Sequence, residues 1–235
     1  MRLVAAIVFF SSIGVMGLCF MYHWYQSYED RADWKTCKVY GIDVSSYQKT
    51  IHWNYVKRAG IEFALIKATE GKSILDKRFM ENWTGCKQNN IIRGAYHYYR
   101  SSVPWQEQYR WIVKNIILDC GDLPLVLDIE EYDFIHQRIF EKDLRQLLVA
   151  LEKYYRCKPI LYSHQHFYNK HLHDSFQEYP LWVAKYDQEK PALKENRVWL
   201  IWQYTDKGHV DGIPFYIDMN CFNGDLNALL LMCKR

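Results

Sequence analysis

The chain has 235 residues, of which 49% are apolar and 24% charged, with 11 Gly and 6 Pro. This length and composition suit a packed globular protein, and they exclude a disordered chain, a collagen-like fibre and a small scaffold held by disulfides. The net charge of +3 is too small to indicate a nucleic-acid binder. Aromatic residues make up 17% of the chain, a surplus that suits ordinary packing and also a cleft where rings stack on sugars.

The chain begins with an apolar segment. Residues 3–21 carry no charge, and their number is close to the roughly 20 residues that a helix needs to cross a bilayer. A cleaved signal peptide has small residues at its exit, whereas the run from Leu18 to Tyr22 is bulky. We therefore expect residues 1–21 to be a retained membrane anchor, with a cleaved signal segment as the alternative. A lipoprotein site at Cys19 ranks third.

The charges that flank this segment predict its orientation. Arg2 precedes the apolar run, and Glu29 and Asp30 follow it. The positive-inside tendency then places the N-terminus in the cytoplasm and the rest of the chain in the periplasm, a lumen or the extracellular space. Residues 22–36 show no clear periodicity of apolar residues and are predicted to form a stalk. Residues 37–235 are predicted to form one enzyme domain.

From residue 37 onward, short β-branched and aromatic runs alternate with stretches of helical period. The clearest helices are predicted over 105–119 and 137–156, where apolar residues recur every three or four positions. Eight strands are predicted, over 39–45, 63–69, 91–99, 124–130, 159–163, 179–186, 199–205 and 216–222.

This alternation predicts an α/β fold, in which βα units build a parallel sheet. Eight strands in this length fit an irregular (β/α) TIM-like barrel with eight strands and fewer than eight helices, because late connections such as 206–215 are too short for full helices. An open doubly wound sheet is the alternative architecture. Its usual nucleotide function is disfavoured, because no Gly-rich phosphate loop follows any strand.

The fourth predicted strand ends in two carboxylic acids. Side chains alternate along a strand, so Asp128 and Glu130 point to the same side, while Leu125, Leu127 and Ile129 point to the other. The apolar set is expected to face the helices, which leaves the acidic pair facing the barrel interior. Burial among aromatic rings and a second carboxylate nearby both raise a carboxyl pKa, which can keep one acid protonated near neutral pH.

Two further acids are expected at the same end of the barrel. Asp43 and Asp218 come from the first and last strands, which are neighbours where the barrel closes. Four converging carboxyls suit either a sugar or a hard metal ion. The sequence has no His-Glu-x-x-His spacing, so we predict no metal and no cofactor, and the surrounding Trp and Tyr residues favour a carbohydrate. Hydrolysis of a glycosidic bond uses such a division of labour between carboxyls.

Six short motifs, taken in order, closely resemble the family 25 glycoside hydrolases, the Chalaropsis-type lysozymes. The motifs are Gly-Ile-Asp-Val-Ser-Ser-Tyr-Gln (41–48), Lys-Ala-Thr-Glu-Gly (67–71), Gly-Ala-Tyr-His-Tyr (94–98), Leu-Asp-Ile-Glu (127–130), Trp-Gln-Tyr (202–204) and Asp-x-Asn-x-Phe-x-Gly (218–224). The resemblance implies a barrel that cleaves the β-1,4 bond between N-acetylmuramic acid and N-acetylglucosamine in peptidoglycan. It further implies Glu130 as proton donor and Asp43, Asp128 and Asp218 as the other catalytic carboxylates.

The resemblance also implies retention of anomeric configuration, with Asp128 orienting the 2-acetamido group of the substrate as an internal nucleophile or with a direct attack instead. Other polar and aromatic residues near the strand ends are candidates for substrate binding, although each could equally pack or support a neighbour. These candidates are Glu70, His97, Tyr99, Tyr162, Trp182, Tyr186, Trp202, Gln203 and Asn220.

Six cysteines follow the apolar segment and include no Cys-x-x-Cys pair, which disfavours zinc ribbons and thiol redox motifs. Disulfides are permitted outside the cytosol, but the sequence leaves their pairing open.

Two functional alternatives also stay open. The chain could hydrolyse another β-linked amino-sugar polymer such as chitin, or it could bind glycans without cleaving them. A monomer is the default expectation.

Overall fold

The computed structural model describes residues 33–131 and 137–234. The predicted anchor, residues 1–21, and most of the predicted stalk lie outside these described residues. Within the described ranges, no helix combines the length and the apolar character that crossing a membrane requires.

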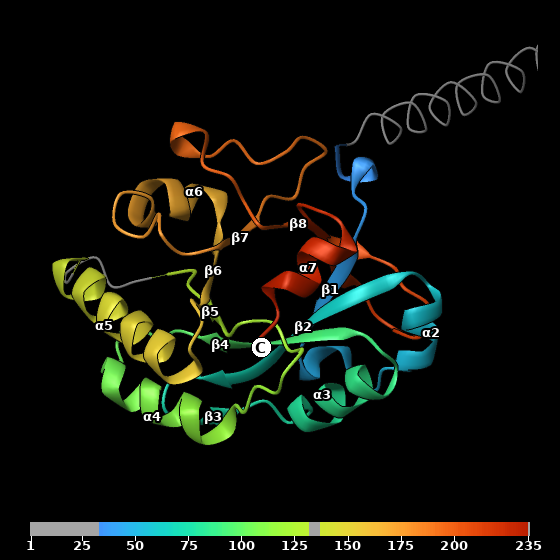
Figure 1. Ribbon diagram of the computed structural model, residues 1–235, viewed down its shortest axis with the longest axis horizontal. Coiled ribbons are helices and arrows are strands. Elements are labelled where there is room, and N and C mark those ends of the chain that lie inside the picture. The colour runs from blue at the N-terminus through green and yellow to red at the C-terminus, as the bar shows by residue number, and fades with distance from the viewer. Residues whose placement is uncertain (1–32, 132–136, 235) are drawn as a thin grey trace, which may run out of the picture.

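Eight strands close into a barrel, as the sequence predicts (Figure 1). The ring runs in the order β1, β9, β8, β7, β6, β5, β4 and β2, and the pairing of β1 with β2 closes it. The strands are β1 (Tyr40–Val44), β2 (Ile61–Glu70), β4 (Ile92–Tyr98), β5 (Val126–Asp128), β6 (Ile160–His164), β7 (Leu181–Ala184), β8 (Ile201–Gly208) and β9 (Ile217–Phe222), and the short β3 (Ile74–Leu75) pairs with the outer part of β2.

The last strand runs against the others, which corrects the expectation of a parallel sheet. Strand β9 pairs antiparallel with both β8 and β1, whereas the other barrel pairs are parallel. The segment between Gly208 and Ile217 is too short for a crossover helix, so the chain turns back directly. As a result Asp218 lies near the start of its strand and not at its end, yet still at the same end of the barrel as Asp43.

The helices lie outside the barrel, and α3, α4 and α5 form an arc along one side of it in Figure 1. Helix α5 has a strongly apolar stripe that includes Leu144, Leu147, Leu148 and Leu151, all fully buried. The helices are α2 (Trp53–Arg58), α3 (Phe79–Gln88), α4 (Trp105–Asn115), α5 (Gln137–Tyr155), α6 (Gln165–Phe167) and α7 (Leu226–Met232), with 3-10 turns η1 (Asp33–Thr36), η2 (Ser46–Gln48) and η5 (Lys194–Asn196) and one π turn, η4 (Tyr168–Leu172).

The barrel interior is filled with side chains below the site. Gly41 faces this interior, and a Cβ at that position would lie 2.4 Å from the ring of Phe63. Glycine is therefore required there for the ring to fit. At the opposite end from the strands' carboxyl termini, Leu229 of α7 and Cys233 join the interior cluster and close the barrel floor. Within the described residues, the open end of the barrel is therefore the mouth formed by the carboxyl ends of the parallel strands.

The segment before β1 is attached to the barrel wall. Cys37 and Cys221 of β9 form a disulfide that spans 184 residues, and the ring of Trp34 stacks on that of Tyr204, with centroids 4.9 Å apart and planes 6° apart. Asp33 donates its backbone N–H to the carbonyl of Gln188. The other cysteines within residues 33–131 and 137–234, namely Cys86, Cys120, Cys157 and Cys233, are free thiols.

Candidate active site

Four carboxyl groups meet at the mouth of the barrel, as the sequence predicts. Asp43 of β1 and Asp218 of β9 are direct cross-strand partners. Asp128 is the last residue of β5, and Glu130 follows two positions later. Each carboxyl interacts electrostatically with two others, in the closed sequence Asp43, Asp218, Glu130, Asp128 and back to Asp43. The alternation of β5 is also as predicted, because Leu125, Leu127 and Ile129 pack on the helix side.

Asp43 is held by two side-chain amides. Gln203 Nε2 and Asn220 Nδ2 each donate a hydrogen bond to Asp43 Oδ2, both at 2.8 Å. The amide of Asn220 is oriented by Trp182, whose Nε1–H donates to Asn220 Oδ1 at 2.8 Å. Because an indole nitrogen can only donate, this contact directs the NH₂ group of Asn220 toward the carboxylate.

Gln203 is oriented in the same way by two tyrosines. The hydroxyls of Tyr162 and Tyr186 donate to Gln203 Oε1 at 2.8 and 3.1 Å. Tyr162 and Trp182 are only 4% and 2% exposed, so they serve as buried hydrogen-bond donors beneath the cavity. Tyr186 is 47% exposed and stands at the mouth, where it offers a ring to a ligand.

The cavity environment favours protonated carboxyls. Burial raises the pKa of Asp43 well above its usual range, and the charge of Asp218 raises it further, although the two amides act against this. Burial, together with the charges of Glu130 and Asp43, also raises the pKa of Asp128 well above its usual range. Burial, followed by the charge of Asp206, raises the pKa of Asp218 to about 6. The site therefore retains protons where isolated carboxyls would have lost them.

Asp128 and Glu130 differ in their access to solvent. Asp128 is 6% exposed, and its buried Oδ1 accepts no hydrogen bond within the described residues. The side chain of Glu130 is 32% exposed, and its Oε1 lies 4.0 Å from His164 Nε2 of β6. The inner carboxyl thus has one oxygen without a hydrogen-bond partner, and the outer carboxyl is accessible from the mouth.

Several residues at the mouth were not among the sequence candidates. Tyr98 lies beside Glu130 and Asp128, and its pKa is raised to about 12, chiefly by burial and then by these two charges. Lys67 lies 5.2 Å from the centroid of the Tyr98 ring, and Arg100 lies 4.5 Å from it. Strand pairing places Tyr98 opposite Asp128, a register that a single strand's sequence does not contain.

Glu70 lies at the rim and is ion-paired. Lys67 Nζ donates to Glu70 Oε2 at 2.8 Å, and Arg100 Nε donates to Glu70 Oε1 at 3.0 Å. Burial acts to raise the pKa of Glu70, but these bonds outweigh it and lower the pKa. Its carboxylate therefore holds two cations in place beside Tyr98.

Three candidate binding residues do not reach the cavity, and these predictions are corrected. His97 lies on the helix side of β4, bonded to Thr69 Oγ1 at 2.8 Å and to Gln108 Oε1 of α4 at 3.1 Å. Tyr99 is 1% exposed and packs against Phe140 of α5. Trp202 is fully buried on the outer face of β8, where its Nε1–H donates to the carbonyl of Lys185. None of these side chains has surface left for a sugar.

Among the described residues, no group of three or more His, Cys, Asp or Glu side chains has an arrangement that could hold a metal ion. The four carboxyls at the mouth are instead coupled to one another and to amide and phenol groups. This set can donate a proton, accept one and hold a polar ligand.

Comparison with known proteins identifies what this arrangement is similar to. The model of the family described as "Glycosyl hydrolases family 25" matches residues 42–213, a range that contains Asp43, Asp128 and Glu130 and ends shortly before Asp218. Lysozyme M1 of Streptomyces globisporus is 33% identical over 219 residues, which cover 85% of this chain and 73% of that protein. The uncharacterized protein YegX of Escherichia coli K12 is 40% identical over 196 residues, which cover 81% and 72% of the two chains.

Among solved structures, a family 25 glycosyl hydrolase from Bacillus anthracis superposes with a TM-score of 0.78 at 32% identity. The superposition covers 83% of this chain and 94% of that structure.

Proposed function

The chain belongs to the glycosyl hydrolases family 25 and is a glycoside hydrolase, and from this premise we propose that it is a lysozyme-type enzyme acting on peptidoglycan. The bond cleaved is the β-1,4 linkage between N-acetylmuramic acid and N-acetylglucosamine, and Glu130 is the general acid. Relatives described as lysozymes support the substrate class. The four carboxyls at the barrel mouth support the chemistry: Asp43 and Asp218 are direct cross-strand partners, and Glu130 is open to the mouth. This gathering of acids is the observation on which the proposal rests.

Glu130 suits the role of proton donor because of its position. It lies just beyond the end of β5 and is the carboxyl of the Asp128–Glu130 pair that is open to the mouth. A glycosidic oxygen lying across the mouth can come within reach of Glu130, which donates its proton to the leaving sugar as the bond breaks. After release of that sugar, the same carboxylate takes a proton from the attacking water.

Asp128 suits the support of the reacting sugar. Its unpartnered Oδ1 can accept a hydrogen bond from the N–H of a 2-acetamido group, which would orient the acetamido oxygen toward the anomeric carbon. In this route the acetamido oxygen attacks, and a water molecule opens the resulting ring with retained configuration. The alternative is direct attack by a carboxylate of the cluster, and both routes use the same proton donor.

Asp43 and Asp218 complete the charge arrangement on the opposite side. Asp43 is fixed by Gln203 and Asn220, so its carboxyl is preorganised before the ligand arrives. Positive charge develops on the sugar ring in the transition state, and a carboxyl of this pair stabilises such charge strongly in a cavity of low dielectric when it is ionised. These two acids therefore serve as electrostatic partners of the reacting sugar.

We further propose that the enzyme works outside the cytosol. The Cys37–Cys221 disulfide supports this, because structural disulfides persist in oxidising compartments. The N-terminal apolar segment, residues 3–21, supports attachment to a membrane or export through one.

The test is digestion of purified peptidoglycan and of chitin by the full chain, followed by mass analysis of the new reducing ends. The proposal expects muramic acid ends from peptidoglycan. New ends from chitin alone would favour the other amino-sugar polymer. Binding without new ends from either polymer would favour a non-catalytic glycan-binding protein.

A further inference from the structure

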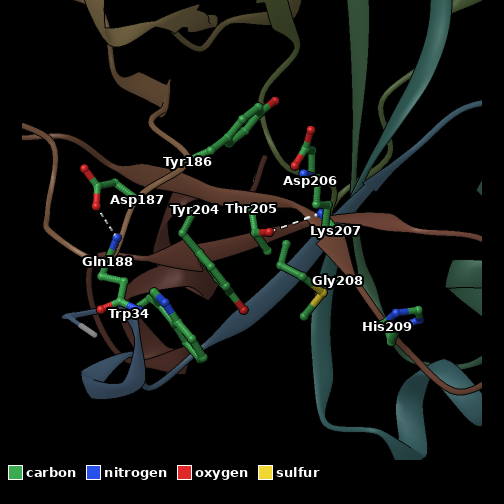
Figure 2. A pocket seen from close by; sticks show the side chains of 11 residues that line it. Trp34, Tyr186, Asp187, Gln188, Tyr204, Thr205, Asp206, Lys207, Gly208 and His209 are labelled. Carbon is green, nitrogen blue, oxygen red and sulfur yellow. Dashed lines mark hydrogen bonds between the residues drawn. The ribbon is translucent and has the colours of Figure 1, made fainter. Parts of the chain in front are cut away.

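A second hollow lies beside the active site, along the outer part of β8. Its volume is about 610 Å³, within the range of sites that hold small ligands. Figure 2 shows Trp34 and Tyr204 on one side of this cleft and Tyr186 and Asp206 on the other. The cleft is further lined by Asp187, Gln188, Thr205, Lys207, Gly208, His209 and Met219.

Two residues of the cleft interact directly with residues of the catalytic centre. Tyr186 lines it and also donates its hydroxyl hydrogen bond to Gln203, which in turn holds Asp43. Asp206 lines it and interacts electrostatically with Asp218. A polymer bound across the catalytic carboxyls can therefore extend into the cleft.

One wall of the cleft lies outside the residues that the family model matches. Trp34 precedes the residues matched by the family model, which begin at position 42. Four contacts hold this wall in place: the stacking of Trp34 on Tyr204, the Cys37–Cys221 disulfide, and the two hydrogen bonds of Asp33 with Gln188 and Lys190. The last of these is a donation from the Lys190 N–H to Asp33 Oδ2 at 3.0 Å. The wall is thus built before any ligand arrives.

The lining chemistry fits an amino sugar. Stacked rings of Trp34 and Tyr204 provide an apolar edge for a sugar, and Gln188 and Thr205 provide hydrogen-bonding groups. Asp187 and Asp206 offset the positive charge of Lys207, so the cleft has no excess of cations to attract a carboxylate-rich peptide. A neutral sugar unit is favoured over an anionic stem.

We propose that this cleft, walled by Trp34 and Tyr204, is an accessory subsite that binds an uncharged N-acetylated amino sugar of the glycan strand, beyond the two sugars at the cleaved bond. The inference rests on the proposed function and deepens it, because the N-terminal segment thereby becomes part of substrate recognition. Long strands gain a contact that short oligosaccharides cannot make.

The first experiment compares kcat/KM of the full chain on long glycan strands freed of stem peptides and on a tetrasaccharide that spans the cleaved bond. Trp34→Ala is expected to lower kcat/KM on long strands about tenfold and to leave the tetrasaccharide value within twofold of wild type. Trp34→Phe, which keeps a ring, is expected to recover most of the loss. Trp111→Ala on α4 removes the same side chain far from the cleft, and it should leave both values unchanged.

The second experiment is independent of turnover. In the Glu130→Gln background, Trp34→Ala is expected to weaken the Kd for a hexamer of N-acetylglucosamine about tenfold. If the wild type cleaves no glycan, the proposed function fails, while this measurement still decides on the subsite. Gln188→Ala serves as a second variant, because it removes only a side chain and keeps the backbone bond to Asp33; it should weaken binding about threefold.

Three results would overturn the subsite. Equal losses on long and short substrates would show that Trp34 merely supports the fold, and thermal unfolding of each variant would confirm that. No loss on either substrate would show that the cleft is unused. A loss seen only on strands that still carry stem peptides would assign the cleft to the peptide.

Discussion

Asp43 and Asp218 face each other across the pairing of β1 and β9, so two carboxyl groups occupy one cross-strand position at the barrel mouth. Like charges directly opposite on neighbouring strands destabilise a sheet. This pair lies at the barrel mouth among the catalytic carboxyls, where burial already disfavours two negative charges. The pair therefore destabilises the folded protein at the place where the reaction needs carboxyls. Its cost can be measured as a pH dependence of the free energy of unfolding.

Asp218→Asn is expected to stabilise the folded protein at pH 7. The pKa of Asp218 is about 6 in the folded chain against 3.8 for the ordinary carboxyl, so the folded state binds the proton more tightly and the free energy of unfolding falls as pH rises through this window. Removing the charge should gain about 1–2 kcal/mol at pH 7, a value reduced for partial solvent exposure. Urea denaturation at pH 7 and at pH 3.5 measures this, and a gain that persists at pH 3.5 would contradict it.

Glu130→Gln is expected to lower turnover sharply and to keep the fold. An amide cannot donate the proton to the leaving oxygen, so kcat should fall at least a hundredfold, or on the order of 10²–10⁴, while the Kd for an N-acetylglucosamine oligomer stays within twofold. Release of reducing ends from peptidoglycan is the measurement. The neighbouring Glu131→Gln is the matched control, because Glu131 is exposed and paired only with Arg100 in the described structure. Equal losses in both variants would refute the assignment.

Trp182→Phe is expected to disturb the hold on Asp43. The change removes the N–H that bonds Asn220 Oδ1 and leaves that buried oxygen unpaired, at a cost of about 1–3 kcal/mol in the free energy of unfolding. The freed amide can rotate, so kcat should also fall. Trp199→Phe makes the same change beside Trp202 on the outer face of the barrel, and it should leave kcat unaltered. Denaturant titration and initial rates distinguish the two positions.

His97→Gln tests the corrected position of that residue. Burial lowers the pKa of His97 to about 4, so the folded state keeps the ring neutral, and its contribution to stability is lost as pH falls from 6.5 toward 4. The variant should retain activity. Between pH 6.5 and pH 4 its free energy of unfolding should fall by about 3 kcal/mol less than that of the wild type. Melting temperatures at pH 7 and pH 4.5 provide the comparison. Loss of substrate binding without loss of stability would instead indicate that the His97 side chain faces the cavity and contacts the substrate.

Replacing both Cys37 and Cys221 by Ser is expected to lower the free energy of unfolding by about 2–4 kcal/mol, because the disulfide restricts the unfolded chain. A reducing agent should produce the same drop in wild-type protein and none in the double variant. Cys120→Ser, at an exposed free thiol, is the control. A wild-type melting temperature that is insensitive to reduction would argue against the bridge.

The order of strands and the four acids could be predicted because each signal is local. The run from Leu127 to Glu130 alternates apolar and acidic residues, which by itself decides which side faces inward. The prediction was wrong where the answer depends on a partner strand. Nothing within β4 shows that the side chain of Tyr98, and not that of Tyr99, lies beside the carboxyl of Asp128, since that follows from the pairing of β4 with β5.

Two other differences have equally specific causes. Trp202 and Gln203 are adjacent in β8, so alternation allows only one of them to face inward, and the hydrogen bond of Gln203 to Asp43 settles which. The antiparallel direction of β9 follows from its short connection, and it moves Asp218 from the end of a strand to its beginning. The pairing of Cys37 with Cys221 joins positions that no local pattern connects.

The barrel floor has a practical consequence for handling the protein. Helix α7 closes the end opposite the mouth, and Lys234 bonds to the backbone at Gly121 and Asp122, before β5 begins. Any tag or tether joined at this terminus must leave from the closed side. Protein immobilised on a bead through its last residues would therefore present its mouth outward, available to insoluble wall fragments too large to diffuse between the bead and the enzyme.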